Sequence, residues 1–215
     1  MTDFSLAVTE RVVRTIADVA LENEYYFAEL DGVVGDGDFG LSLANGFRKL
    51  MDEWETLDRS SPGIFLKKVS MIITSRVGGV SGAIWGTGFM RAGFAAGDKP
   101  ELTADDVIAM LRAAEEGMKK RGQSDVGDKT LLDSFIPAVD ELERVLKSGG
   151  TVQEALDAAA VKAREQTEVI KPWVAKRGRA AYTGERSCDT YDAGSIAIAM
   201  MAETLAKSWQ EIATP

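Results

Sequence analysis

Three aspartates lie close together in one short, glycine-rich stretch of the chain. Asp31, Asp36 and Asp38 all occur within residues 31–40, DGVVGDGDFG. Two carboxylates about 4 Å apart repel by roughly 4 kcal/mol at an effective dielectric constant near 20, so a loop that gathers three needs a compensating charge. Mg²⁺ and Ca²⁺ supply such a charge through oxygen ligands. The spacing therefore indicates a site for a hard divalent cation.

Two other interpretations of this stretch have to be compared with a metal site. Asp and Gly are common in turns, and an Asp before a helix often caps the helix N-terminus, so a purely structural turn stays open. An EF-hand is excluded, because counting from Asp36 puts Leu41 where that loop needs its glycine and Phe47 where it needs its bidentate Glu.

A second glycine-rich stretch, residues 78–88, has the sequence GGVSGAIWGTG and precedes a helical pattern. The N-terminus of a helix exposes unpaired N–H groups and the positive end of the helix dipole, so Gly78 to Gly82 could hold an anion. The alternative is a flexible turn followed by a helix of small residues that packs closely against its neighbours.

Arginines gather in a third stretch, residues 176–195, KRGRAAYTGERSCDTYDAGS. The guanidinium groups of Arg177, Arg179 and Arg186 would suit a phosphoryl group, because arginine presents a planar set of N–H donors. A solvated basic loop that balances an acidic protein is the alternative. A weaker signal comes from residues 127–130, GDKT, where Asp128 or Thr130 could simply cap the next helix.

Together these stretches offer acids for Mg²⁺, helix N-termini for phosphates and arginine for transition-state charge, which is the set of groups that phosphoryl transfer needs. The chain has no Walker A motif, no kinase glycine-rich loop with its downstream Lys and no dinucleotide-binding G-x-G-x-x-G after a strand. A nucleotide would therefore be bound in another way.

Composition excludes several classes of function. The net charge of −9 argues against a nucleic-acid or anionic-membrane surface. The 215 residues include no histidine, which excludes imidazole bases, Ser-His-Asp triads and phosphohistidine relays within this chain. The single cysteine, Cys188, cannot form an internal disulfide. With no signal peptide and no apolar stretch long enough to cross a bilayer, we expect a soluble, cytoplasmic protein.

The hydrophobic periodicity predicts helices nearly throughout. Val107, Met110, Leu111, Ala114 and Met118 follow one helix face, and similar patterns, with caps at Ser61, Thr103 and Thr151, give about eight helices. The first of these is expected to run to about residue 27, and period-2 strands are missing. Short connections and the absence of a linker predict one domain over residues 1–215 in which neighbouring helices are antiparallel. The loops before the second, fourth, sixth and eighth helices then lie at one end, and these are the four stretches above.

Four segments in this order, LDGVVGDGDFG, GGVSGAIWGTGF, RGQSDVGDKTLLDSFIPA and KRGRAAYTGERSCDTYDAGS, resemble the nucleotide-binding subunit of dihydroxyacetone kinases, the DhaL type. The likeness extends over nearly the whole chain. It implies a single DhaL-like nucleotide-binding domain, an all-α barrel of about eight antiparallel amphipathic helices that binds ADP or ATP at one end.

The resemblance also implies roles for individual residues. Asp31, Asp36 and Asp38 would hold the nucleotide phosphates through two Mg²⁺ ions, and Arg179 would act in catalysis. The residues that would line the nucleotide are Phe39, Gly40, Leu41, Ser42, Val80, Ser81, Gly122, Leu131, Arg179, Asp192, Ala193 and Gly194.

Members of this family work with a DhaK-type subunit that holds the ketose on a histidine, which fits the absence of histidine here. The resemblance thus implies that this chain donates the phosphoryl group to a short ketose on such a partner, with ATP or a DhaM-like phosphotransfer protein as the source. An ADP-sensing or scaffold subunit that acts on a regulator without turnover is the alternative. A Mg²⁺-dependent phosphohydrolase is less favoured, because no residue is an evident base for water.

Two positions depart from the family pattern. Phe39 stands where histidine is usual, so a polar contact would be replaced by apolar packing or stacking. Ala193 stands where proline is usual, which loosens a turn. From this divergence we hypothesise that the substrate is another short ketose, such as a tetrulose.

Overall fold

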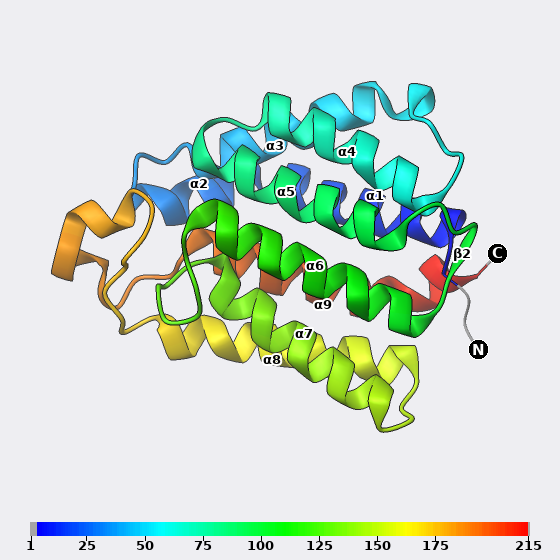
Figure 1. The fold of residues 1–215 in the computed structure, drawn as a ribbon. Coiled ribbons are helices and arrows are strands. Elements are labelled where there is room, and N and C mark those ends of the chain that lie inside the picture. The colour runs from blue at the N-terminus through cyan, green and yellow to red at the C-terminus, as the bar shows by residue number, and fades with distance from the viewer. Residues whose placement is uncertain (1–3, 215) are drawn as a thin grey trace.

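A computed structural model describes residues 4–214, except for the side chain of Val80. The described residues are mostly helical (Figure 1), which confirms the predicted all-α class. The α-helices are α1 (Leu6–Glu22), α2 (Glu24–Gly32), α3 (Phe39–Asp52), α4 (Pro62–Arg76), α5 (Gly79–Ala96), α6 (Ala104–Gly122), α7 (Leu131–Lys147), α8 (Val152–Ile170) and α9 (Ala193–Ala213). The shorter elements are the 3₁₀ segments η1 (Trp54–Thr56) and η2 (Ala180–Ser187) and the strands β1 (Phe4–Ser5) and β2 (Glu101–Leu102).

Eight of these helices, all except the short α2, form an up-and-down barrel. Each of them packs on the next along the chain, from α3 on α4 to α8 on α9, and α1 closes the ring by packing on both α3 and α9. The predicted barrel of about eight antiparallel helices is therefore confirmed. That residues 1–215 make up a single domain stays a prediction.

The helices begin where the sequence places caps. Thr103 with Asp106 opens α6, and Thr151 with Glu154 opens α8, each as a reciprocal capping box. The Ser61 side chain accepts the N–H of Ile64 at the start of α4. A cap of this kind contributes about 1 kcal/mol, because it satisfies N–H groups that have no partner within the helix.

The N-terminal helix ends earlier than the periodicity predicts. Its last residue is Glu22, and Asn23, whose side-chain amide donates to the carbonyl of Val19 at 2.8 Å, separates α1 from α2. Asparagine competes for backbone hydrogen bonds in this way and is therefore poorly suited to a helix interior. The break leaves α2 as a separate short helix that leads directly into the acidic loop.

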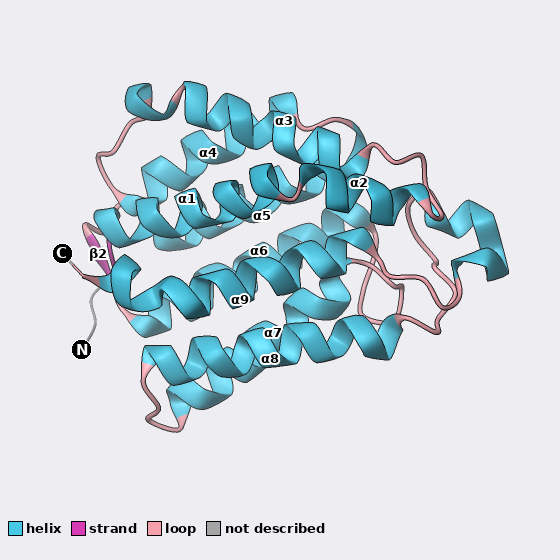
Figure 2. Cartoon of the chain, turned by 180° about the vertical axis from the view of Figure 1, so that it is seen from behind, coloured by secondary structure: helices cyan, strands magenta, loops and turns pink. Residues whose placement is uncertain are grey.

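The strands β1 and β2 form a small antiparallel sheet, in which Phe4 pairs with Leu102 and Ser5 with Glu101. Two residues per strand are too few to produce an alternating pattern in the sequence. Figures 1 and 2 show β2 at the end of the barrel where α1 begins and α9 finishes. At the opposite end lie α2, η2 and the loops that precede α3, α5, α7 and α9.

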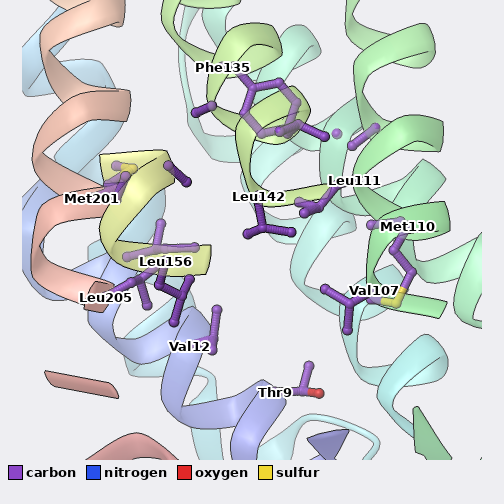
Figure 3. A pocket seen from close by; sticks show the side chains of 18 of the residues that line it. Thr9, Val12, Val107, Met110, Leu111, Phe135, Leu142, Leu156, Met201 and Leu205 are labelled. Carbon is purple, nitrogen blue, oxygen red and sulfur yellow. The ribbon is translucent and has the colours of Figure 1, made fainter. Parts of the chain in front are cut away.

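An apolar pocket of about 320 Å³ lies between the helices of the barrel (Figure 3). Its lining includes Val12, Val107, Leu111, Leu142, Leu156 and Leu205. A polyphosphate would lose its hydration there without gaining polar partners, so this interior is unsuited to such a ligand. In the part of the chain that the structure describes, no helix is both long and apolar enough to cross a membrane.

Candidate functional site

The three predicted metal ligands come together at the loop end of the barrel. Asp31 lies in the last turn of α2, whereas Asp36 and Asp38 lie in the loop that leads to α3. One carboxylate oxygen from each lies within 4.8 Å of the others. Three oxygens at this separation can share a hard cation, so the donor set fits Mg²⁺ or Ca²⁺.

Glycines shape the acidic loop. The N–H of Gly35 donates to the carbonyl of Asp31 at 2.6 Å. A Cβ on Gly35 would lie 2.3 Å from Oδ1 of Asp31, so a larger residue would displace that carboxylate. Gly37 has a φ of +73°, in the left-handed region that favours glycine. These two positions allow the chain to turn back and bring Asp36 and Asp38 to Asp31.

The electrostatics of the cluster favour a bound cation. Burial, followed by the charges of Asp36 and Asp31, raises the pKa of Asp38 above its ordinary value, although Arg179 opposes the shift. The carboxylates thus destabilise one another, which is the condition that a divalent cation relieves.

Arg179 is held against this cluster from a distant part of the chain. Its Nε lies 2.8 Å from Oδ2 of Asp36, and its side chain is 67% exposed. The other two predicted arginines of this segment, Arg177 and Arg186, have different surroundings. Arg177 donates from Nε to the carbonyl of Gln123 at 2.7 Å, and Arg186 is exposed on η2. Of the three arginines, Arg179 is therefore the one that pairs with the acidic loop.

The glycine-rich stretch opens α5 beside the start of α3. Gly78 is the N-cap of α5 and provides no side-chain cap, and Gly79 has a φ of +62°. A Cβ on Gly78 would lie 3.2 Å from Oγ of Ser42, which places the start of α5 next to α3. Uncapped N–H groups at the start of a helix are well suited to an anion. Ser81 is half-buried in the first turn, whereas the side chain of Val80 lies outside the described residues.

Leu131 and residues 192–194 meet where α7 and α9 begin. The Oγ of Ser195 donates to the carbonyl of Thr130 at 2.7 Å, and a Cβ on Gly194 would lie 3.0 Å from Cβ of Leu131. Asp192 caps α9 by accepting the N–H of Ser195 at 2.7 Å. Burial raises the pKa of Asp192 to about 6. Leu131, Asp192, Ala193 and Gly194 are thus neighbours, with clear structural roles here as caps and packing residues.

At the start of α3, Phe39 and Gly40 face inward. The ring of Phe39 lies 6.2 Å from that of Phe27, in the apolar core, so the position where the family usually has histidine is occupied by apolar packing. A Cβ on Gly40 would lie 2.0 Å from the carbonyl oxygen of Glu24, so Gly40 allows α3 to pack on α2. Leu41, by contrast, is 42% exposed. Gly122 ends α6 close to Ile84 of α5.

One residue that the sequence did not single out is Lys129. Its side chain is buried, and its ammonium donates to the carbonyls of Lys171, Trp173 and Ser187. The stretch GDKT indicated helix capping, which Thr130 and Asp133 indeed perform at the start of α7. Nothing local in the sequence distinguishes this buried lysine from the exposed ones.

Comparison with known proteins places the chain in a family. The DAK2 domain model matches residues 33–207. The ADP-binding subunit DhaL of the PEP-dependent dihydroxyacetone kinase of Escherichia coli K12 is 33% identical over 194 residues, which cover 90% of this chain and 92% of that subunit. The corresponding subunit of kinase 2 of Listeria innocua is 35% identical, with 79% of each chain covered.

A longer relative and a solved structure share only part of their length with this chain. The L-erythrulose kinase of Pectobacterium atrosepticum is 32% identical, with 87% of this chain and 32% of that enzyme covered. The dihydroxyacetone kinase of C. freundii has a TM-score of 0.73 at 24% identity and covers 97% of this chain. The chain spans about a third of that structure, and the likeness shows the shared fold. The protein belongs to the DAK2-domain family, as a member of its DhaL branch.

Proposed function

We propose that this protein is the nucleotide-binding subunit of a short-ketose kinase, which binds ADP or ATP with Mg²⁺ at the loop end of the barrel. The observation that carries the proposal is that the carboxylates of Asp31, Asp36 and Asp38 lie together and that Arg179 pairs with Asp36. Relatives that match most of the chain support it, since two of them carry names that specify an ADP-binding subunit of a dihydroxyacetone kinase.

Each group at this end has a task in phosphoryl transfer. The three aspartates would hold two Mg²⁺ ions, which supply positive charge to the phosphate oxygens. The N–H groups that open α5, with the hydroxyls of Ser42 and Ser81, would donate hydrogen bonds to phosphate oxygens. The guanidinium of Arg179 would contact the transferring phosphoryl group in the transition state, where the positive charge of arginine has its largest effect on rate.

The other half of the reaction needs a second protein. The chain contains no histidine, and the acids at the site would be occupied in holding cations, so none of them serves as a base for the attacking hydroxyl. We therefore propose that a DhaK-like subunit presents the ketose and accepts the proton of its hydroxyl. The phosphoryl source is ATP or a phosphotransfer protein that recharges bound ADP.

Titration calorimetry tests Mg²⁺-dependent binding of ADP, which both the kinase subunit and the ADP-sensing alternative require. ADP should bind at one site per chain in the presence of Mg²⁺, and the affinity should fall sharply when EDTA removes the cation. The absence of binding under both conditions would refute the proposed function. Turnover that appears only after addition of a DhaK-like partner would favour the kinase over an ADP-sensing subunit.

The acceptor can be tested in the same assay. Curated relatives include L-erythrulose and D-erythrulose kinases at 32% and 30% identity, which supports the tetrulose hypothesis. The reconstituted pair should be assayed with dihydroxyacetone, D-erythrulose and L-erythrulose at matched concentrations. A higher kcat/KM for an erythrulose is expected, and clear preference for dihydroxyacetone would contradict this hypothesis while leaving the kinase itself supported.

A further inference from the structure

Lys129 is an unusual buried lysine at the loop end of the barrel. Its side chain is only 3% exposed. The Nζ donates to the carbonyls of Lys171 at 2.8 Å, Trp173 at 2.9 Å and Ser187 at 2.6 Å. An ammonium group has three donors, and all three are used here for backbone oxygens.

The backbone of Lys129 is also constrained. Its φ of 61° lies in the left-handed region, where a residue with a side chain is strained. Burial disfavours the charged form as well and lowers the pKa of the ammonium. The surrounding hydrogen bonds offset both costs, which is expected where the position of a group is strongly determined.

The three carbonyls bracket the segment that carries Arg179. Lys171 caps the C-terminal end of α8, where a positive charge also interacts favourably with the helix dipole. Trp173 follows it, and Ser187 lies at the end of η2. The ammonium group of Lys129 is therefore hydrogen-bonded to both ends of the segment formed by residues 171–187.

Other hydrogen bonds beside Lys129 hold the same segment, residues 171–187. The N–H of Lys176 donates to the carbonyl of Asp128 at 3.0 Å, and its Nζ donates to the carbonyl of Gly127 at 2.7 Å. The N–H of Ala175 donates to Oγ of Ser187 at 2.9 Å. The stretch GDKT, residues 127–130, is thus hydrogen-bonded to the segment that carries Arg179.

Arg179 itself has little to hold it in place. Its side chain is two-thirds exposed, and the pair with Asp36 is its salt bridge to the acidic loop. An exposed ion pair of this kind contributes little to stability, because water screens it and both side chains lose conformational freedom. The direction of Arg179 toward the aspartates must therefore come mainly from the backbone that carries it.

We propose that Lys129 is a positioning residue for phosphoryl transfer, which fixes residues 171–187 so that Arg179 faces the aspartate cluster. The inference rests on the proposed function, because it assigns Lys129 to the same reaction. Misplacement of a catalytic group by about 1 Å can cost on the order of 100-fold in rate. Loss of the anchor should therefore act on turnover through Arg179.

A double-mutant cycle tests this route. Lys129→Met, Arg179→Ala and the double variant should be assayed with the DhaK-like partner, and ADP affinity measured by calorimetry with Mg²⁺. Lys129→Met should lower kcat by about 100-fold. It should change the affinity for ADP less than threefold. In the Arg179→Ala background the same change should lower kcat less than threefold further, because the residue it positions is already absent.

Controls separate positioning from general stability. Lys147→Met removes an exposed lysine at the far end of α7 and should leave kcat and affinity unchanged. Lys129→Arg keeps the charge and several donors, so it should recover at least tenfold of the lost turnover. If Lys129→Met does not fold, as judged by circular dichroism, Lys129→Gln takes its place in the cycle. Losses that multiply in the double variant, or an unchanged kcat, would overturn the proposal.

Hydrogen exchange supplies a measurement that does not depend on turnover. The amides of residues 174–188 should exchange faster in Lys129→Met than in wild type or Lys147→Met. Absence of turnover in the wild type would count against the proposed function, whereas unchanged exchange in this segment would overturn the role of Lys129. The two failures are thereby distinguished.

Discussion

The Nε of Arg179 lies 2.8 Å from Oδ2 of Asp36, although the two residues belong to distant parts of the sequence. The pair joins the arginine-bearing segment before α9 to the acidic loop before α3. It also shows that positive charge already offsets part of the repulsion among the three aspartates, which agrees with the lowering effect of Arg179 on the pKa of Asp38.

Replacement of Arg179 should affect turnover more than nucleotide affinity. Arg179→Ala is expected to lower kcat by about 10²-fold or more, because the guanidinium stabilises charge that develops in the transition state. The affinity for ADP with Mg²⁺ should change much less. Steady-state kinetics with the partner and calorimetry measure the two quantities.

The matched control for this variant is Arg144→Ala. Arg144 pairs with Glu141 on the exposed face of α7, in the last turn of that helix, so its removal should leave both quantities unchanged. A loss of affinity in Arg179→Ala at constant kcat would instead make Arg179 a ground-state ligand of the nucleotide.

Removal of one carboxylate should weaken metal-dependent binding. Asp36→Asn keeps the size of the side chain but takes away a charge from the cluster, so the affinity for ADP with Mg²⁺ should fall by at least about tenfold. Affinity measured in EDTA should hardly change. The control is Asp105→Asn, an exposed acid at the start of α6, at the opposite end of the barrel. Equal affinity for wild type and Asp36→Asn at every Mg²⁺ concentration would exclude Asp36 as a ligand.

Gly40 should prove sensitive to the smallest substitution. A Cβ there would lie 2.0 Å from the carbonyl oxygen of Glu24 and 2.5 Å from the N of Ala28, so Gly40→Ala must push α3 away from α2. We expect the free energy of unfolding to fall by about 1–3 kcal/mol, as for overpacked interiors. Gly32→Ala is the control, because a Cβ on Gly32 finds its nearest atom at 3.9 Å. Denaturant unfolding measures both, and equal stabilities would contradict the close packing.

The raised pKa of Asp192 should make stability depend on pH. Its folded pKa of about 6 lies above the ordinary 3.8, so the folded state binds this proton more tightly than the unfolded chain. The contribution to the free energy of unfolding is therefore largest below about pH 4 and falls, by up to roughly 3 kcal/mol, as the pH rises toward 6. Asp192→Asn retains an N-cap acceptor for Ser195 but cannot ionise. Denaturant unfolding from pH 4 to 7 should show a smaller fall for Asp192→Asn, and identical profiles would refute the shift.

The sequence alone was sufficient for much of the fold. The helix starts at Ser61, Thr103 and Thr151 appear where predicted, because a cap depends on residues three positions apart. The break at Asn23 was missed, since asparagine also occurs within helices and only the bond from its side chain to Val19 reveals the end of α1. The strands β1 and β2 were missed because two-residue strands leave no periodic pattern.

Part of the candidate site also follows from the sequence. The sequence predicts that Asp31, Asp36 and Asp38 form one site, because all three belong to one short glycine-rich stretch, and in the structure their carboxylates lie together at the end of α2 and in the loop that follows it. The placement of the four loops at one barrel end also followed from the number of helices and the short connections between them.

Only the tertiary structure showed how Arg179 meets the acids and what holds its segment in place. Their spacing alone does not distinguish Arg177, Arg179 and Arg186, and the family resemblance points to Arg179; in the structure Arg179 pairs with Asp36, and hydrogen bonds from Lys129 and the neighbouring loop hold residues 171–187. Such contacts join segments far apart in the chain. Their formation depends on how the helices pack, so no local pattern of residues records them.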